Sequence, residues 1–168
     1  FYSILQIEIN FWSEYQEASN NFLLGEVWNP DVDYMAKYQD HMDSVFNFAL
    51  QDDMRKVFNF GEDMTVISEG LKRQVYIQFV ILAHQRFFLW LVICTFPKSL
   101  AFVFQREAFK DTSVLGIFVD NHDMPRFLNY TQDMALFKNA LAISILGDGI
   151  PFIYYGSEQA FSGGTDPA

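Results

Sequence analysis

The sequence has 168 residues, of which 51% are hydrophobic and 19% are charged, so it can bury a core and lacks the composition of a disordered chain. Its 11 Lys and Arg against 21 Asp and Glu give a net charge of -10, which would repel nucleic-acid phosphates and favours a neutral partner. The single cysteine, Cys94, excludes an internal disulfide and a zinc site built from cysteines.

The first part of the chain predicts helices alternating with short strands. Residues 8–19 place apolar side chains at three-residue steps among acidic and amide side chains, the pattern of an amphipathic helix. Residues 22–28 (FLLGEVW) and 42–48 (MDSVFNF) are short apolar runs typical of buried strands. Residues 51–74 indicate a helix in two pieces that separate near Gly61.

The last part of the chain continues this alternation. Residues 114–119 (VLGIFV) and 150–155 (IPFIYY) predict two more strands. Between them Thr131 is expected to cap a helix that ends at Gly147. The expected inner face of this helix is Met134, Phe137, Leu141 and Ile145. Because the strands alternate with helices and no Asn-Gly hairpin joins them, we expect an α/β fold with a parallel sheet and an active site at the carboxyl ends of the strands.

Residues 75–105 do not fit this pattern, because they are far more apolar than their surroundings and contain no acidic residue. The block does not resemble a transmembrane helix. Gln78 and His84 interrupt it ahead of Pro97, so its longest apolar stretch is shorter than the roughly 18 residues that cross a membrane. As a core insertion it would need a partner surface. We favour translated non-coding sequence, such as a retained intron, because deleting the block restores one continuous amphipathic helix.

Residues 1–6 are also out of character and do not begin with Met. They contain no basic segment followed by a cleavable apolar stretch, so no targeting signal is visible. We therefore expect a truncated chain in which residues 1–6 are a leader of the same non-coding origin.

Two carboxylates follow predicted strands, Glu26 in the first run and Asp123 after the third, beside His122. A lone buried glutamate is more often a structural partner, and Asp-Asn-His clusters commonly form turns. Together they predict glycoside hydrolysis, which needs one acid to protonate the leaving oxygen and a negative charge facing an oxocarbenium-like centre. Apolar neighbours would keep Glu26 protonated near neutral pH, whereas the histidine and solvent would keep Asp123 ionised.

At these residues the sequence resembles the α-amylase family, glycoside hydrolase family 13, in its fungal form. The resemblance rests on Phe22–Phe48, which contains Gly-Glu-Val-Trp, and on Gly116–Ala168, which contains Val-Asp-Asn-His-Asp and the Gly-Gly-Thr-Asp-Pro loop. It implies that residues 7–168 are a partial (β/α)8 TIM-type barrel. They would supply strands five to eight only, with residues 75–105 as an anomalous insert.

The resemblance also implies roles for individual residues. Glu26 matches the general acid/base, and Asp123 matches the aspartate that stabilises the transition state. His122 and Asp166 match residues that bind sugar, and Trp28 would stack on a sugar ring or pack against the barrel rim. The nucleophilic aspartate of the family belongs to an Arg-x-Asp motif ahead of residue 7, and residues 1–6 contain no aspartate. We therefore assign no nucleophile in this chain.

A full-length member of the family is expected to bind structural Ca2+, but no calcium or other metal ligand can be carried over to this chain. The implied function is retaining hydrolysis of internal α-1,4-glucosidic bonds in starch or glycogen by a monomeric, extracellular enzyme. Its partners would be α-glucans, without nucleic acid or membrane. Three alternatives stay open: a superfamily member that acts on another α-glucan or on disaccharides, a non-catalytic sugar-binding or pseudogene remnant, and a membrane protein that uses residues 75–105. The presence of Glu26, His122 and Asp123 argues against a non-catalytic transporter partner.

Overall fold

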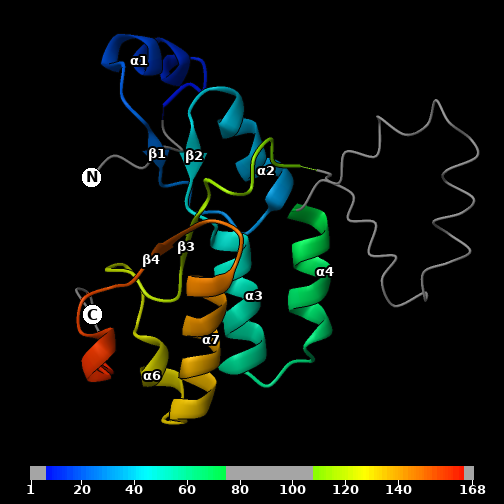
Figure 1. Ribbon diagram of the computed structural model, residues 1–168, viewed down its shortest axis with the longest axis vertical. Helices are drawn as coiled ribbons and strands as arrows, with labels where there is room; N and C mark the ends of the chain where they lie inside the picture. The colour runs from blue at the N-terminus through cyan, green and yellow to red at the C-terminus, as the bar shows by residue number, and fades with distance from the viewer. Residues whose placement is uncertain (1–6, 75–107, 165–168) are drawn as a thin grey trace, which may run out of the picture.

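The computed structural model describes residues 7–74 and 108–164, which form helices alternating with short strands (Figure 1). The strands are β1 (Leu24–Gly25), β2 (Ser44–Val45), β3 (Gly116–Phe118) and β4 (Ile150–Phe152). The α-helices are α1 (Phe11–Ser19), α2 (Val32–Ala36), α3 (Phe48–Phe58), α4 (Thr65–Gln74), α6 (Phe127–Tyr130) and α7 (Met134–Leu146). Two 3-10 turns, η2 (Lys37–Asp40) and η3 (Ser157–Gln159), complete the described elements.

The strands form two small parallel sheets that lie side by side. β1 pairs with β2, with Leu24 opposite Ser44, and β3 pairs with β4, with Gly116 opposite Ile150. A parallel bridge between Phe46 and Gly116 joins the two pairs, so the described strands follow one another in chain order and point the same way. This confirms the predicted parallel α/β arrangement.

Each strand is shorter than the apolar run that predicted it. In the run of residues 42–48, Asn47 ends the strand and caps α3, since its side chain accepts the Leu50 N–H at 2.9 Å. Helix α3 therefore begins at Phe48, earlier than residue 51. The predicted break near Gly61 is confirmed, because this glycine adopts a φ of 76° between α3 and α4.

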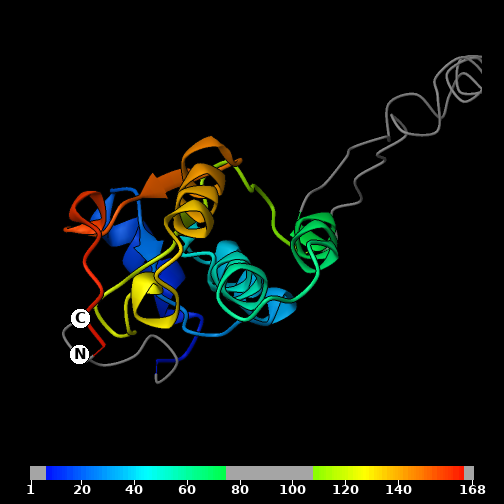
Figure 2. The same ribbon diagram turned by 90° about the horizontal axis from the view of Figure 1, so that it is seen from below.

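Helix α3 lies between α4 and α7, on one side of the strands (Figures 1 and 2). Its apolar side chains Leu50, Met54 and Val57 enter one core cluster together with Ile117 of β3 and Phe137 of α7. A second cluster packs under β1 and β2 around α2. The two clusters hold the helices against the strands.

Our prediction for α7 was wrong in two respects. Its cap is Asp133 and not Thr131, since the Asp133 carboxylate accepts the Ala135 N–H at 2.8 Å. Phe137 is buried as expected, but Met134 and Ile145 are 40% and 54% exposed. The buried face continues through two small residues, Ala140 and Ser144. Because α7 is apolar on nearly every side, its periodicity alone could not show which face packs against the sheet.

Two predicted segments, the leader at residues 1–6 and the apolar block at residues 75–105, lie outside the described residues. Over residues 7–74 and 108–164, every helix is too short or too polar to span a bilayer.

Candidate active site

A cavity of about 210 Å³ opens beyond the carboxyl ends of the strands. Its floor is formed by four phenylalanines, Phe46, Phe48, Phe118 and Phe152. The rings pack edge to face, with centroids 4.8 Å apart for Phe46 and Phe152 and 5.0 Å apart for Phe48 and Phe118. Polar side chains surround this floor, namely Glu26, Asp120, Asn121, His122 and Tyr154. An apolar floor with a few convergent polar groups is typical of a small-molecule site.

Glu26 follows β1 directly and is half-buried at the edge of this cavity. Burial raises the pKa of its carboxyl, the negative charge of Asp123 raises it further, and His122 opposes both effects. Burial disfavours the ionised carboxylate because it removes water from the charge. Burial and Asp123 thus shift the pKa of Glu26 in the direction that a general acid requires.

His122 and Asp123 lie on the loop after β3, and the His122 Nε2 is 3.3 Å from the Asp123 Oδ1. Both side chains are partly exposed. One nitrogen of His122 and one oxygen each of Glu26 and Asp123 all lie within 4.8 Å of one another. The fold therefore brings together three of the five residues that the sequence pointed to, from strands far apart in the chain.

The other two candidates are not part of this group. Trp28 is 50% exposed, and its ring stacks on Phe48 with centroids 6.2 Å apart and planes 17° apart. Phe48 is one of the described residues that line the cavity, whereas Trp28 is not. Asp166 lies outside the described residues.

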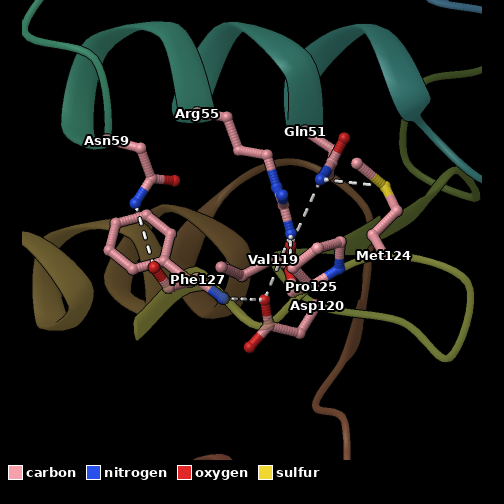
Figure 3. A network of polar contacts seen from close by, with 8 residues as sticks. All are labelled: Gln51, Arg55, Asn59, Val119, Asp120, Met124, Pro125 and Phe127. Atoms are coloured by element: carbon pink, nitrogen blue, oxygen red, sulfur yellow. Dashed lines mark hydrogen bonds and ion pairs between the residues drawn. The ribbon is translucent and has the colours of Figure 1, made fainter. Parts of the chain in front are cut away.

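Two charged residues at the site were given no role from the sequence, namely Asp120, which lines the cavity, and its partner Arg55. The buried Asp120 Oδ1 accepts the Phe127 N–H at 2.7 Å and lies 3.5 Å from the Arg55 Nη2 (Figure 3). Burial raises the pKa of Asp120, whereas the Phe127 N–H, Arg55 and Arg126 lower it. The available signal was an arginine that stands between the apolar residues Met54 and Val57 of a predicted helix.

Arg126 is a third residue that the sequence did not single out. It is fully buried, and its guanidinium lies 4.0 Å from the ring centroid of Tyr154 and 4.9 Å from that of Tyr155. Its backbone N–H donates to Gly163 O at 2.9 Å. These contacts join the loop after β3 to the segment after β4.

The side chains described include one candidate group for a metal ion. Among them, the one group of three His, Cys, Asp or Glu side chains able to hold a metal ion is Glu26, His122 and Asp123. Calcium takes six to eight oxygen ligands, whereas this group offers two carboxylates and an imidazole nitrogen, a donor that suits transition metals. This group of side chains does not fit Ca2+.

The sequence matches the model of the α-amylase catalytic domain over residues 6–166. It is 32% identical over 169 residues to Alpha-amylase 2 of Schwanniomyces occidentalis, covering 98% of this chain and 27% of that protein. It is 36% identical over 156 residues to Alpha-amylase 1 of the same yeast, covering 93% of this chain and 25% of that protein. The chain thus spans about a quarter of the length of these relatives.

Solved structures agree with this match. An α-amylase from Malbranchea cinnamomea superposes with a TM-score of 0.74 at 31% sequence identity, covering 96% of this chain and 28% of that one. Parallel strands with helices between them, and two carboxylates at the strand ends, are features that the α-amylase barrel requires. The chain belongs to the α-amylase catalytic-domain family.

Proposed function

We propose that the protein hydrolyses internal α-1,4-glucosidic bonds of starch or glycogen with retention of configuration, and that this chain supplies its acid and a second carboxylate. The observation that carries the proposal is the convergence of Glu26, His122 and Asp123 within 4.8 Å at the edge of the phenylalanine-floored cavity. The names of the relatives support an α-glucan as the substrate.

In the proposed reaction, protonated Glu26 donates its proton to the glycosidic oxygen while the bond to the anomeric carbon breaks. The Asp123 carboxylate faces the positive charge that develops on the sugar, and His122 hydrogen-bonds a sugar hydroxyl. Glu26, now ionised, then accepts a proton from the water that releases the sugar. The nucleophile of the first step would be an aspartate that we do not assign in this chain.

We assign residues 7–168 to strands five to eight of an eight-stranded barrel. The four described strands are parallel and adjacent in chain order, as barrel strands are. Asp166 and Trp28 would contact sugar further along the cleft. By family resemblance, the full-length protein would be extracellular and monomeric and would bind structural Ca2+.

We further propose that residues 75–105 are translated non-coding sequence. Long-read sequencing of the transcript tests this directly. A spliced message that joins codon 74 to codon 106 supports it, and a main message that keeps the block refutes it.

A second candidate function is a sugar-binding or pseudogene remnant without turnover. One observation favours it: residues 1–6, just ahead of Ile7, contain no aspartate that could act as nucleophile. In this case the chain would bind maltooligosaccharides without cleaving them.

A chimera separates the two functions. Residues 7–168 would replace the matching segment of Alpha-amylase 1 of Schwanniomyces occidentalis, and reducing ends released from soluble starch would be measured. We expect activity that falls about 10²–10⁴-fold in the matched Glu26→Gln variant, the usual contribution of a general acid. A folded chimera that binds acarbose but releases no sugar supports the remnant, and one that neither binds nor cleaves refutes both.

A further inference from the structure

Three polar side chains recur at four-residue steps along α3 and point toward the loop that carries His122 and Asp123 (Figure 3). They are Gln51, Arg55 and, at the end of the helix, Asn59. Residues four apart lie above one another on the same face of a helix. Gln51 and Arg55 are only 2% and 4% exposed, and buried polar groups are costly unless they are hydrogen-bonded.

All three side chains donate to backbone carbonyls of one segment, residues 119–127. The bonds are Gln51 Nε2 to Val119 O (3.4 Å), Arg55 Nη2 to Pro125 O (2.7 Å) and Asn59 Nδ2 to Phe127 O (3.1 Å). The acceptors are main-chain atoms, so these contacts hold the path of the backbone and not merely one side chain. They bracket His122 and Asp123 on both sides.

Arg55 and Asp120 connect the two ends of this segment. Arg55 Nη2 contacts both Pro125 O and the Asp120 carboxylate, at 2.7 Å and 3.5 Å. The same Asp120 oxygen accepts the Phe127 N–H at 2.7 Å. Asp120 thus links the start of the segment to its end, and Arg55 fixes that link to the helix. A guanidinium suits this place because its planar fork can serve two acceptors at once.

We infer that α3 sets the position of His122 and Asp123 relative to Glu26, with Arg55 as the central positioning residue and Gln51 and Asn59 holding the two ends of the loop. Glu26 directly follows β1, which shares none of these bonds, so its separation from Asp123 depends on how the helix holds the loop. The consequence for catalysis rests on the proposed function, whereas the positioning itself does not.

The pKa of the Glu26 carboxyl depends on its distance from the Asp123 carboxylate, so a titration of Glu26 measures a change in that distance. The groups that face Glu26 are Asp123 and His122 from the loop, and Asp120 and Tyr154 line the same cavity. Burial is the first cause of its raised pKa and the charge of Asp123 is the second. If the loop loses its contacts with α3, Asp123 moves away from Glu26. The pKa of Glu26 then falls, even where the protein remains folded.

The experiment uses the chain itself, with 13C carboxyl NMR of Glu26 assigned through Glu26→Gln, and with the ring signals of His122. Arg55→Leu removes both contacts of the guanidinium. Arg55→Lys keeps the charge opposite Asp120 but not the fork, and is the variant to compare if Arg55→Leu does not fold. Ile67→Ala, which removes buried apolar volume from the facing helix α4, is the control for lost stability alone.

We expect both Arg55 variants to lower the Glu26 midpoint and shift the His122 ring signals, with a smaller effect for lysine, and Ile67→Ala to leave both unchanged. The inference is overturned if the folded Arg55 variants titrate like the control. In the starch-cleaving chimera, Arg55→Leu should reduce kcat about 10²-fold, the scale of a misplacement of about 1 Å. An inactive parent chimera would count against the proposed function, while the NMR comparison would still decide the positioning.

Discussion

Gly116 lies where two rings of the cavity floor meet, and replacing it with alanine tests the packing of the site. A Cβ at this position would lie 2.7 Å from Phe46 Cδ1 and 3.2 Å from Phe152 Cε2. Carbon atoms in favourable contact are about 3.5–4.0 Å apart, so the Phe46 ring would have to retreat by about 1 Å. It has little room, because its centroid is already 5.6 Å from that of Phe118 and 4.8 Å from that of Phe152.

Overpacking of this kind costs about 1–3 kcal/mol of unfolding free energy. At roughly 2–4 °C per kcal/mol for a chain of this size, Gly116→Ala should lower Tm by about 2–12 °C. Thermal and urea unfolding followed by circular dichroism measure this loss. We expect the slope of unfolding free energy against urea concentration to stay constant, since the surface exposed on unfolding hardly changes.

A matched double variant identifies the cause. Phe46→Leu removes the ring that the new methyl group meets, so Gly116→Ala should cost less in the Phe46→Leu background than in the parent chain. Gly61→Ala serves as the control for backbone strain alone, because its φ is 76° and no atom lies within 4 Å of the added Cβ. The packing argument fails if Gly116→Ala costs less than about 0.5 kcal/mol, or if its cost is the same in both backgrounds.

Three further predictions follow from the same structure. Asp133→Ala should cost about 1 kcal/mol in urea unfolding because it removes the cap of α7, whereas Thr131→Ala should cost clearly less; equal losses would contradict the assignment of the cap. Burial raises the pKa of Asp53, so its contribution to stability is present below its ordinary pKa and is lost as pH rises through the raised one. Asp53→Asn should therefore flatten the fall in unfolding free energy between the ordinary and the raised pKa of Asp53, and an unchanged pH profile would refute it. Addition of Ca2+ or EDTA should leave Tm of this chain unchanged, because Glu26, His122 and Asp123 do not suit calcium; a rise in Tm with Ca2+ would overturn that judgement.

Much of the fold, and the three residues that lie together in the candidate site, could be predicted from the sequence. Short apolar runs predicted four parallel strands, and Glu26 and His122–Asp123 stood where such strands end. This works because the carboxyl ends of parallel strands meet at one edge of a sheet, so residues far apart in the chain become neighbours without any knowledge of their side-chain contacts. The same rule could not show how far apart the carboxylates lie or which of them is buried.

What only the tertiary structure decided is which polar residues leave water and what they contact. Arg55 looks like an ordinary helix charge in the sequence, yet the packing of α3 against β3 and α7 buries it beside Asp120. Likewise α7 is apolar on nearly every side, so the elements that pack against it determine that Phe137 and Ala140 are buried and that Ile145 is exposed. Local pattern sets the type and order of elements through backbone hydrogen bonding and periodicity, but burial is a property of the surfaces that meet, and those are chosen only when the elements pack together.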